Sequence, residues 1–426
     1  MAYILGLLIL ALLLKDAAPI GDTYVLRGLS EGLALIVGAY WFLTHSRLEI
    51  YKKYILIFGY LIVLSSTIPL SSQPIYVGLQ VISLAAVLLF FIAHLEASPN
   101  DAAKNETVMN VTMMAFIIVC LASLVLLAYS PGFAYEETLE GRRFRGLFGK
   151  PAKMAATSGL LLGLCIFSER KVLLRAAGIL SSLPCLYLTG SRTFWAAGAV
   201  SLLITAIFYL RRKLEWGLAA VMIISFSLIV TTVADINISS KARSRILRID
   251  SLERMSGRTV IWGLAFEKFW DRPFLGYGFT LGSDAFKEGE IPQSRPPISP
   301  TLLNNETFTL HSGYVQALLD SGFLGASLYL SIVMSVLWRL IKYDTGRKYG
   351  AEMYCAGFLT ISNFGESVIL SAAVFHAVFY WYLATFALSL DRFHENAQET
   401  LAAETENTKT SKAVSKKRKY ELLKTT

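Results

Sequence analysis

Three residues far apart in the chain have side chains that suit the transfer of a group held by a phosphate. Arg192 stands in a short polar turn between two apolar runs, Arg258 at the start of an expected helix, and His311 where the next apolar run begins. A guanidinium offers forked donors to phosphate oxygens, and a helix N-terminus attracts anions. A neutral imidazole can take a proton from an attacking hydroxyl. In the alternative interpretation, these three residues have no role in chemistry and are ordinary side chains at the membrane interface or at helix ends.

The segments that must position these residues are apolar. Hydrophobic residues make up 54% of the 426 residues and charged residues only 17%, below the about 25% of soluble domains. Runs of about 20 apolar residues are long enough to cross a bilayer as helices. The sequence predicts an all-α polytopic membrane protein with about 12 such helices, at 2–14, 24–45, 54–70, 74–94, 108–130, 151–167, 172–189, 194–210, 214–234, 313–341, 350–368 and 371–390.

Lysine and arginine in short loops set the orientation, because they mark the cytoplasmic side. Basic residues recur in every second loop except the one near Lys104, and in the tail, so both termini are expected in the cytoplasm. These residues include Arg47, Lys52, Lys53, Arg170, Lys171, Arg175, Arg211, Arg212, Lys213, Arg339, Lys342, Arg347, Lys348 and Lys416–Lys419. The segments 131–150, 190–193 and 235–312 then lie outside, and His311 is the one histidine expected there.

One outer loop breaks this charge rule. It carries Arg142, Arg143, Arg145, Lys150 and Lys153 on the side where basic residues are disfavoured. An anionic ligand at the outer membrane face would account for them. A further ionisable residue, Glu366, falls within the eleventh apolar run, where it must find a partner.

The chain divides into four parts by this pattern: helices 1–9 in residues 1–234, a large outer loop over 235–312, helices 10–12 in 313–390 and a basic cytoplasmic tail over 391–426. Within the large loop, the spacing predicts an amphipathic helix that opens at Ser256 or Gly257 and stops at Asp271. Such a helix would lie on the membrane surface or over a cavity between the spans. A glycine-bearing turn, Phe274–Phe279, follows it.

Missing motifs narrow the chemistry. The chain has no Asp-x-Asp pair, no phosphate-binding glycine loop ending in Gly-Lys-Ser/Thr, no Gly-x-Ser-x-Gly and no His-Glu-x-x-His. We therefore expect no metal and no cofactor. Arginines would have to offset the charge of a departing diphosphate.

Several short motifs, in this order, resemble the O-antigen ligase / O-antigen polymerase superfamily of bacterial envelope enzymes. They are Ser191-Arg192, Arg258 with Trp262, Pro273-Phe-Leu-Gly-Tyr-Gly278, and His311-Ser-Gly-Tyr314 with Gly322-Phe-Leu-Gly325. The upstream stretch Arg145-Gly-Leu-Phe-Gly-Lys-Pro151 is similar to the family's basic outer-loop segment. Lys153 departs from the Pro-Asn that many relatives have near this position.

The resemblance implies an inverting, metal-independent glycosyltransferase with a GT-C-type helical fold in the bacterial inner membrane. Its donor would be a glycan on undecaprenyl diphosphate, and its acceptor a hydroxyl of a lipid A core sugar on the periplasmic side, in lipopolysaccharide biosynthesis. Arg192 and Arg258 would bind the diphosphate, with Arg142 and Arg145 as further donor-binding residues. His311 would activate the acceptor hydroxyl.

Other functions stay open from the sequence. An O-antigen or exopolysaccharide polymerase would move the glycan onto another lipid-linked repeat, and a protein O-oligosaccharyltransferase would move it onto protein. The outer loops lack the Arg-x10-Gly patterns frequent in polymerases. A lipid-linked glycan transporter is the non-enzyme alternative, but the chain shows no paired repeats with broken helices. No nucleic-acid partner is expected.

Overall fold

The fold is described from a computed structural model that covers most of the predicted spans. It describes residues 12–13, 24–45, 47–97, 101–138, 141–168, 171–209, 258–282, 286, 310–343, 348–370 and 374–391. The predicted span 214–234, most of the span 2–14, much of the loop 235–312 and the tail beyond 391 lie outside the described residues.

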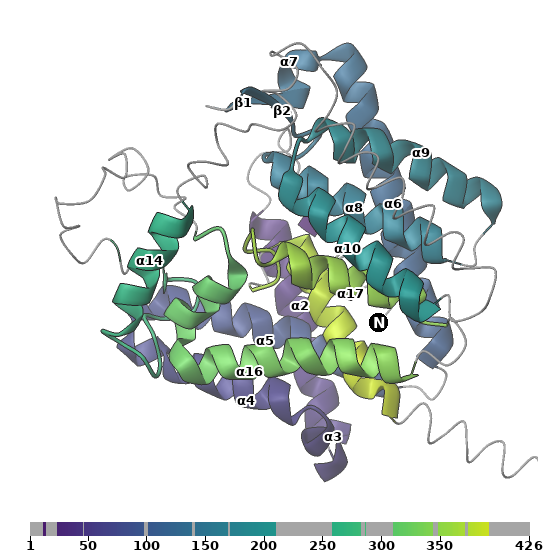
Figure 1. Cartoon of the computed structure of the whole chain (residues 1–426). Coiled ribbons are helices and arrows are strands. Elements are labelled where there is room, and N and C mark those ends of the chain that lie inside the picture. The colour runs from purple at the N-terminus through teal and green to yellow at the C-terminus, as the bar shows by residue number, and fades with distance from the viewer. Residues whose placement is uncertain are drawn as a thin grey trace, which may run out of the picture.

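Helices make up nearly all of the described chain, as the sequence predicts (Figure 1). The helices are α2 (Tyr24–His45), α3 (Leu48–Lys53), α4 (Ile55–Ser66), η2 (Ile68–Leu70), α5 (Pro74–Glu96), α6 (Asp101–Tyr129), α7 (Pro131–Ala134), α8 (Pro151–Phe167), α9 (Val172–Leu188), α10 (Arg192–Tyr209), α14 (Arg258–Phe269), α16 (Gly313–Tyr343), α17 (Gly350–Ser362) and a last helix over 375–391.

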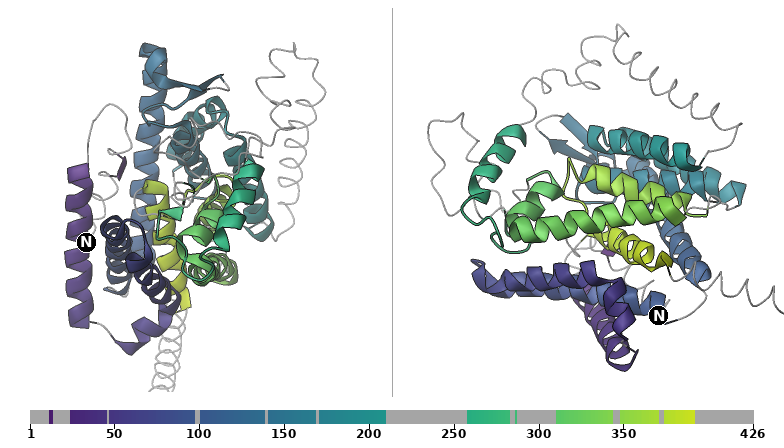
Figure 2. Two further views of the ribbon diagram at one scale, coloured as in Figure 1. Left: turned by 90° about the vertical axis from the view of Figure 1, so that its left-hand side faces the viewer. Right: turned by 60° about the horizontal axis from the view of Figure 1, so that its bottom comes forward.

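Three helices within the described residues are long and apolar enough to cross a membrane. They are Pro74–Glu96, Asn105–Tyr129 and Gly313–Tyr343, and four shorter apolar helices accompany them. Large apolar side chains on the outer surface of the bundle stay exposed, as lipid contact requires; on α2 these include Ile36 (68%) and Leu43 (86%). In the left view of Figure 2, α2 (dark purple) stands at the edge of the bundle. These features make the chain a membrane protein, while the count of about twelve spans stays a prediction.

Helix α17 packs against α8, α10 and α16. Two glycines of α8, Gly159 and Gly163, leave room for the rings of Phe358 and Tyr354 of α17. The Tyr354 hydroxyl donates a hydrogen bond of 3.1 Å to the Gly159 carbonyl. Small residues that let helices approach closely are the usual contact in membrane bundles. This packing fixes α17 and thereby the turn that follows it.

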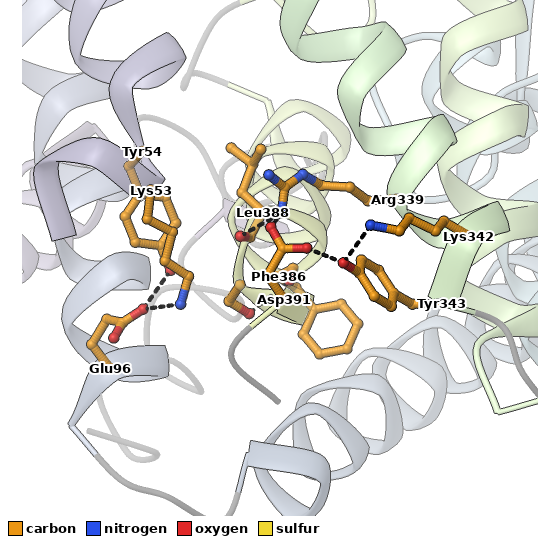
Figure 3. Close-up of polar contacts among 10 residues, drawn as sticks. Lys53, Tyr54, Glu96, Arg339, Lys342, Tyr343, Phe386, Leu388 and Asp391 are labelled. Carbon is orange, nitrogen blue, oxygen red and sulfur yellow. Dashed lines mark hydrogen bonds and ion pairs between the residues drawn. The ribbon is translucent and has the colours of Figure 1, made fainter. Parts of the chain in front are cut away.

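Figure 3 shows two groups of polar contacts, one around Glu96 and one, the Asp391 cluster, around Asp391. Lys53 forms an ion pair of 2.6 Å with Glu96, and Arg339 pairs with Asp391 at the end of the last helix. Partial burial raises the pKa of the Asp391 carboxyl, but the hydrogen bond from Tyr343 and the nearby Arg339 guanidinium outweigh it and hold that pKa below its ordinary value. Lys53, Glu96, Arg339 and Asp391 flank the ends that the charge pattern assigns to the cytoplasm. The orientation of the bundle in the membrane stays a prediction.

Two local features differ from the sequence-based expectation. The loop 131–150, which the charge pattern places outside, holds an antiparallel hairpin of β1 (Tyr135–Thr138) and β2 (Gly141–Phe144), so the described part of the fold is not purely helical. Helix α17 ends at Ser362, before the predicted span does, so Glu366 lies in a turn and not in a membrane helix. The Asn363 side chain stabilises that turn: its Oδ1 accepts hydrogen bonds from the backbone N–H groups of Val368 and Ile369.

Candidate functional site

His311 and Glu366 form a polar pair at the end of the bundle opposite the Asp391 cluster. The Nδ1 atom of His311 lies 3.5 Å from the Oε2 atom of Glu366. Their side chains are 42% and 24% exposed, so a substrate can reach the pair. A carboxylate beside Nδ1 favours the proton on that nitrogen and leaves Nε2 as the basic atom. The distance of 3.5 Å is at the upper limit of a hydrogen bond.

Asn363 joins the two segments that carry this pair. Its backbone carbonyl accepts a hydrogen bond of 2.8 Å from the Gly313 N–H, and its side-chain amide donates one of 2.9 Å to the Tyr329 hydroxyl. A side chain at Gly313 would collide with the Asn363 amide. The start of α16 and the turn after α17 are therefore held in one arrangement.

The backbone of His311 is in the left-handed region, with φ 49°. This conformation costs a non-glycine residue about 1–2 kcal/mol. Such outliers persist where the surrounding contacts enforce them, and they are frequent at functional sites. Here the Leu310 carbonyl just before His311 accepts a hydrogen bond of 2.9 Å from the Trp262 indole N–H.

That indole bond also connects α14, which begins at Arg258, to the residue before His311. The helix matches the predicted amphipathic one in its bounds. Its apolar side packs on the protein: Ile261, Leu264 and Ala265 are buried in a cluster with Leu310 and Leu319. The predicted apolar face therefore covers the start of α16 (Figure 1).

The glycine-bearing turn after α14 binds to the backbone of α16. The N–H groups of Tyr277 and Gly278 donate to the carbonyls of Leu319 and Asp320, at 2.8 and 2.9 Å. The buried Asp320 carboxylate accepts hydrogen bonds from the Gly282 N–H, at 2.6 Å, and the Gln316 amide, at 2.7 Å. The turn that was predicted as tight is thus fixed on the helix that follows His311.

Gly322 makes this docking possible. It interrupts α16 with φ 62° and ψ −164°, and a side chain there would collide with the backbone of Phe274. The kink frees the N–H groups of Phe323 and Leu324, which donate to the carbonyls of Pro273 and Phe274 at 2.7 and 3.3 Å. Glycine is the residue that adopts this conformation without steric cost.

Arg192 is the first residue of α10 and is half-buried. Gly190, with φ 60°, turns the chain between α9 and α10. The Trp195 indole N–H donates a hydrogen bond of 2.9 Å to the Leu186 carbonyl, and the Trp195 ring stacks on Tyr187. These contacts fix the turn that Arg192 follows.

The packing of α10 on α17 sets the position of Arg192 relative to Glu366. Phe194 contacts Phe358, and Gly198 lies beside the Tyr354 hydroxyl, so the two helices run antiparallel. The start of α10 and the end of α17 therefore lie at the same end of the bundle. Arg192 and Glu366 share that end, together with the start of α16.

One arginine of the β1–β2 hairpin contacts the turn between α9 and α10. The Nε–H group of Arg143 donates a hydrogen bond of 3.2 Å to the carbonyl of Thr189, which lies three residues before Arg192. Arg142 pairs with Glu137 at 3.0 Å, with both side chains more than two-thirds exposed. Arg145 donates to the Phe133 carbonyl and lies over the Phe133 ring. An exposed pair such as Arg142–Glu137 contributes only about 0–1 kcal/mol, so Arg142 can exchange its partner for an anion at little cost.

Residues 177–330 match the family model described as O-antigen ligase. This segment of the chain is similar to an O-antigen ligase family domain. A comparison with curated proteins gives no match. The domain contains Arg192, Arg258 and His311, whereas the hairpin arginines and Glu366 lie on either side of it. Members of the family are glycosyltransferase-like enzymes, either ligases or polymerases.

Four residues in or near the matched segment were missed or misplaced by the sequence reasoning. Glu366 was noted only as a buried ionisable group, and its partner could not be named. Arg143 was counted among the basic residues but not assigned to the site. Asn363 and Asp320 gave no signal, because a polar residue near a helix end is ordinary. Among the described residues, no group of His, Cys, Asp and Glu side chains gathers in a way that could hold a metal ion.

Proposed function

We propose that this chain is an O-antigen ligase. It would transfer a glycan from undecaprenyl diphosphate to a sugar hydroxyl of the lipid A core at the periplasmic face of the inner membrane. The observation that carries this proposal is the His311–Glu366 pair. Trp262 of α14, the helix that begins at Arg258, bonds to the residue before His311, and α10 begins with Arg192 at the same end of the bundle.

The reaction would be a single displacement that inverts the anomeric centre. The acceptor oxygen attacks the anomeric carbon of the donor's first sugar, and the bond from that carbon to the diphosphate oxygen breaks. His311 Nε2 takes the proton of the attacking hydroxyl, and the neighbouring Glu366 carboxylate stabilises the imidazolium that forms. Undecaprenyl diphosphate leaves with the bonding electron pair.

The arginines would bind the leaving diphosphate. Arg192 and Arg258 are each the first residue of a helix, where the free backbone N–H groups already favour an anion. A guanidinium adds paired donors to this partial positive charge. Charge that develops on the departing diphosphate would be offset there without a metal.

The Arg143–Thr189 contact supports a role for the hairpin in shaping the donor site. Through it, the basic loop is attached to the turn that precedes Arg192. Arg142 and Arg145 would then extend the positive surface over which the diphosphate approaches. Their contribution would be to donor capture, since neither contacts the Arg192 turn in the described structure.

The test is a transfer assay with the purified protein in nanodiscs, undecaprenyl-diphosphate glycan as donor and lipid A core as acceptor. The proposal predicts glycan attached to lipid A core and release of undecaprenyl diphosphate. Longer glycans on undecaprenyl diphosphate, with lipid A core unchanged, would instead make the protein a polymerase. A reaction mixture without acceptor controls for hydrolysis of the donor.

A further inference from the structure

A patch of large apolar side chains stays uncovered around the end of α14. This aromatic patch consists of Phe266, Trp270, Phe274, Phe323 and Leu324, of which Trp270 is 74% and Phe274 67% exposed. Backbone hydrogen bonds from Phe323 to Pro273 and from Leu324 to Phe274 join its two halves. The patch is therefore one surface, made by α14, the turn after it and the kink of α16.

The aromatic patch is separate from the face of α14 that packs on the protein. The other side of α14 buries Ile261, Leu264 and Ala265, so Phe266 and Trp270 form a second apolar face on the same short helix. Water contact on such a surface is unfavourable by roughly 25 cal/mol for each Å². Contiguous exposed apolar surface usually marks a site of contact with a membrane or another molecule.

The surface of α16 identifies the contact. Beyond Phe323, the side chains of Leu330, Met334 and Trp338 are exposed along one face of the helix, while Ile332, Val333 and Val336 are buried on the other. This helix is long and apolar enough to cross a membrane. The exposed face is therefore a lipid-facing stripe, and the aromatic patch continues it at the end of the helix where His311 lies.

The composition of the patch suits the boundary between acyl chains and headgroups. Tryptophan is enriched at that depth because its ring is apolar and its N–H is polar. Charged side chains, namely Lys268, Asp271 and Arg272, follow Phe266 and border Trp270. Lys268 and Asp271 form an exposed ion pair of 3.3 Å, which headgroups and water can solvate.

We propose that the aromatic patch inserts into the outer leaflet at the headgroup boundary and anchors α14 there. The lipid bilayer is the partner. Anchoring fixes the end of α14, and this keeps Arg258, at the start of the same short helix, near the membrane surface where a lipid-borne diphosphate lies. This last consequence rests on the proposed function, whereas the anchoring itself stands on the patch and its continuity with α16.

The experiment measures how membrane lipids quench the fluorescence of Trp270. Full-length wild type and Trp270→Phe are placed in nanodiscs of phospholipids brominated near the headgroup, brominated near the acyl-chain end, or unbrominated. The difference between wild type and Trp270→Phe gives the emission of Trp270 alone. Trp338→Phe is the matched control, since Trp338 lies on the lipid-facing stripe farther along α16.

Headgroup-side bromine should remove more than half of the Trp270 emission and chain-end bromine should remove less. Trp338 precedes the ion-paired Arg339 at the other end of α16, so its emission should be quenched in the same order, which makes it the positive control. A Trp270 emission that neither lipid quenches, but that aqueous acrylamide does, overturns the proposal. So does protection from acrylamide that appears only when glycan acceptor is added, since Trp270 would then stack on sugar.

A second variant tests the patch without touching Trp270. Phe274→Asp combined with Phe323→Asp should reduce quenching of Trp270 by the headgroup-side bromine at least twofold while the circular dichroism spectrum is unchanged. Unchanged quenching would overturn the anchoring role of the patch. None of these readouts uses glycan transfer, so a failure of the anchoring and a failure of the proposed function are distinguishable.

Discussion

The Nδ1 atom of His311 lies 3.5 Å from the Oε2 atom of Glu366, although 55 positions separate the two residues in the chain. The pair depends on the fold: His311 precedes α16, Glu366 follows α17, and Asn363 ties the two segments together. The imidazole thereby acquires a carboxylate on one nitrogen and an accessible second nitrogen. This is the arrangement that a general base requires.

Glu366→Gln should lower the transfer rate by at least about tenfold, because the amide removes the charge that stabilises the imidazolium. The loss should stay below the about 10²–10⁴-fold expected when the base itself is removed. Glu366→Asp should restore part of the rate. Glu49→Gln, an exposed residue at the start of α3, is the matched control. Equal rates for wild type and Glu366→Gln would show that the carboxylate has no role in transfer.

Arg192→Lys and Arg258→Lys should each lose most of the transfer activity and weaken donor binding. Lysine keeps the charge but lacks the forked donors that match a diphosphate. Binding of undecaprenyl-diphosphate glycan, measured with protein in nanodiscs, provides the readout. Arg47→Lys, an arginine before α3, should behave as wild type. Unchanged donor affinity in both site variants would mean that any positive charge suffices there.

Gly322→Ala should destabilise the protein by about 1–3 kcal/mol, since alanine is strained at φ 62° and its methyl group meets the Phe274 backbone. A lower midpoint of thermal unfolding in detergent measures this. Gly263→Ala is the matched control: no atom lies within 4 Å of a methyl group there, and alanine favours a helix by about 0.5–1 kcal/mol. Unfolding of Gly322→Ala at the wild-type midpoint would contradict the account of the kink.

The sequence predicted most of the helices that position the candidate site. It did not predict the contacts between them. Amphipathic spacing gave α14 with its end within two residues, at Phe269 against the predicted Asp271, and the apolar runs gave α10 and α16. Periodicity could not reveal that α14 turns its apolar side to the protein, because a membrane surface and a protein surface select the same residues. The hairpin of β1 and β2 was missed, since its strands are short and charged.

Glu366 shows the limit most clearly. An apolar run on both sides of the residue predicted a continuous span, whereas Asn363 ends α17 by accepting backbone hydrogen bonds from the turn. Side-chain capping of this kind depends on local geometry that hydropathy does not record. The expected span over 214–234 and the rest of the large loop remain predictions, because they lie outside the described residues.

Labelling of engineered cysteines tests the orientation of the bundle. A membrane-impermeant maleimide applied to spheroplasts should label Glu267→Cys, on the exposed face of α14, and should not label Lys52→Cys in α3. The four native cysteines are buried, so background labelling should be low. Labelling at position 52 in intact spheroplasts would reverse the assigned orientation and remove His311 from the periplasmic side.

The central claim is that His311 activates the acceptor hydroxyl, and it is tested most directly by comparing transfer with donor binding in His311→Ala. Both are measured on the same nanodisc preparation, with His45→Ala, an exposed histidine at the end of α2, as control. The account predicts a loss of transfer of about 10²–10⁴-fold with donor affinity within about twofold of wild type. A loss of donor binding in proportion to the loss of transfer would contradict it and make His311 a binding residue.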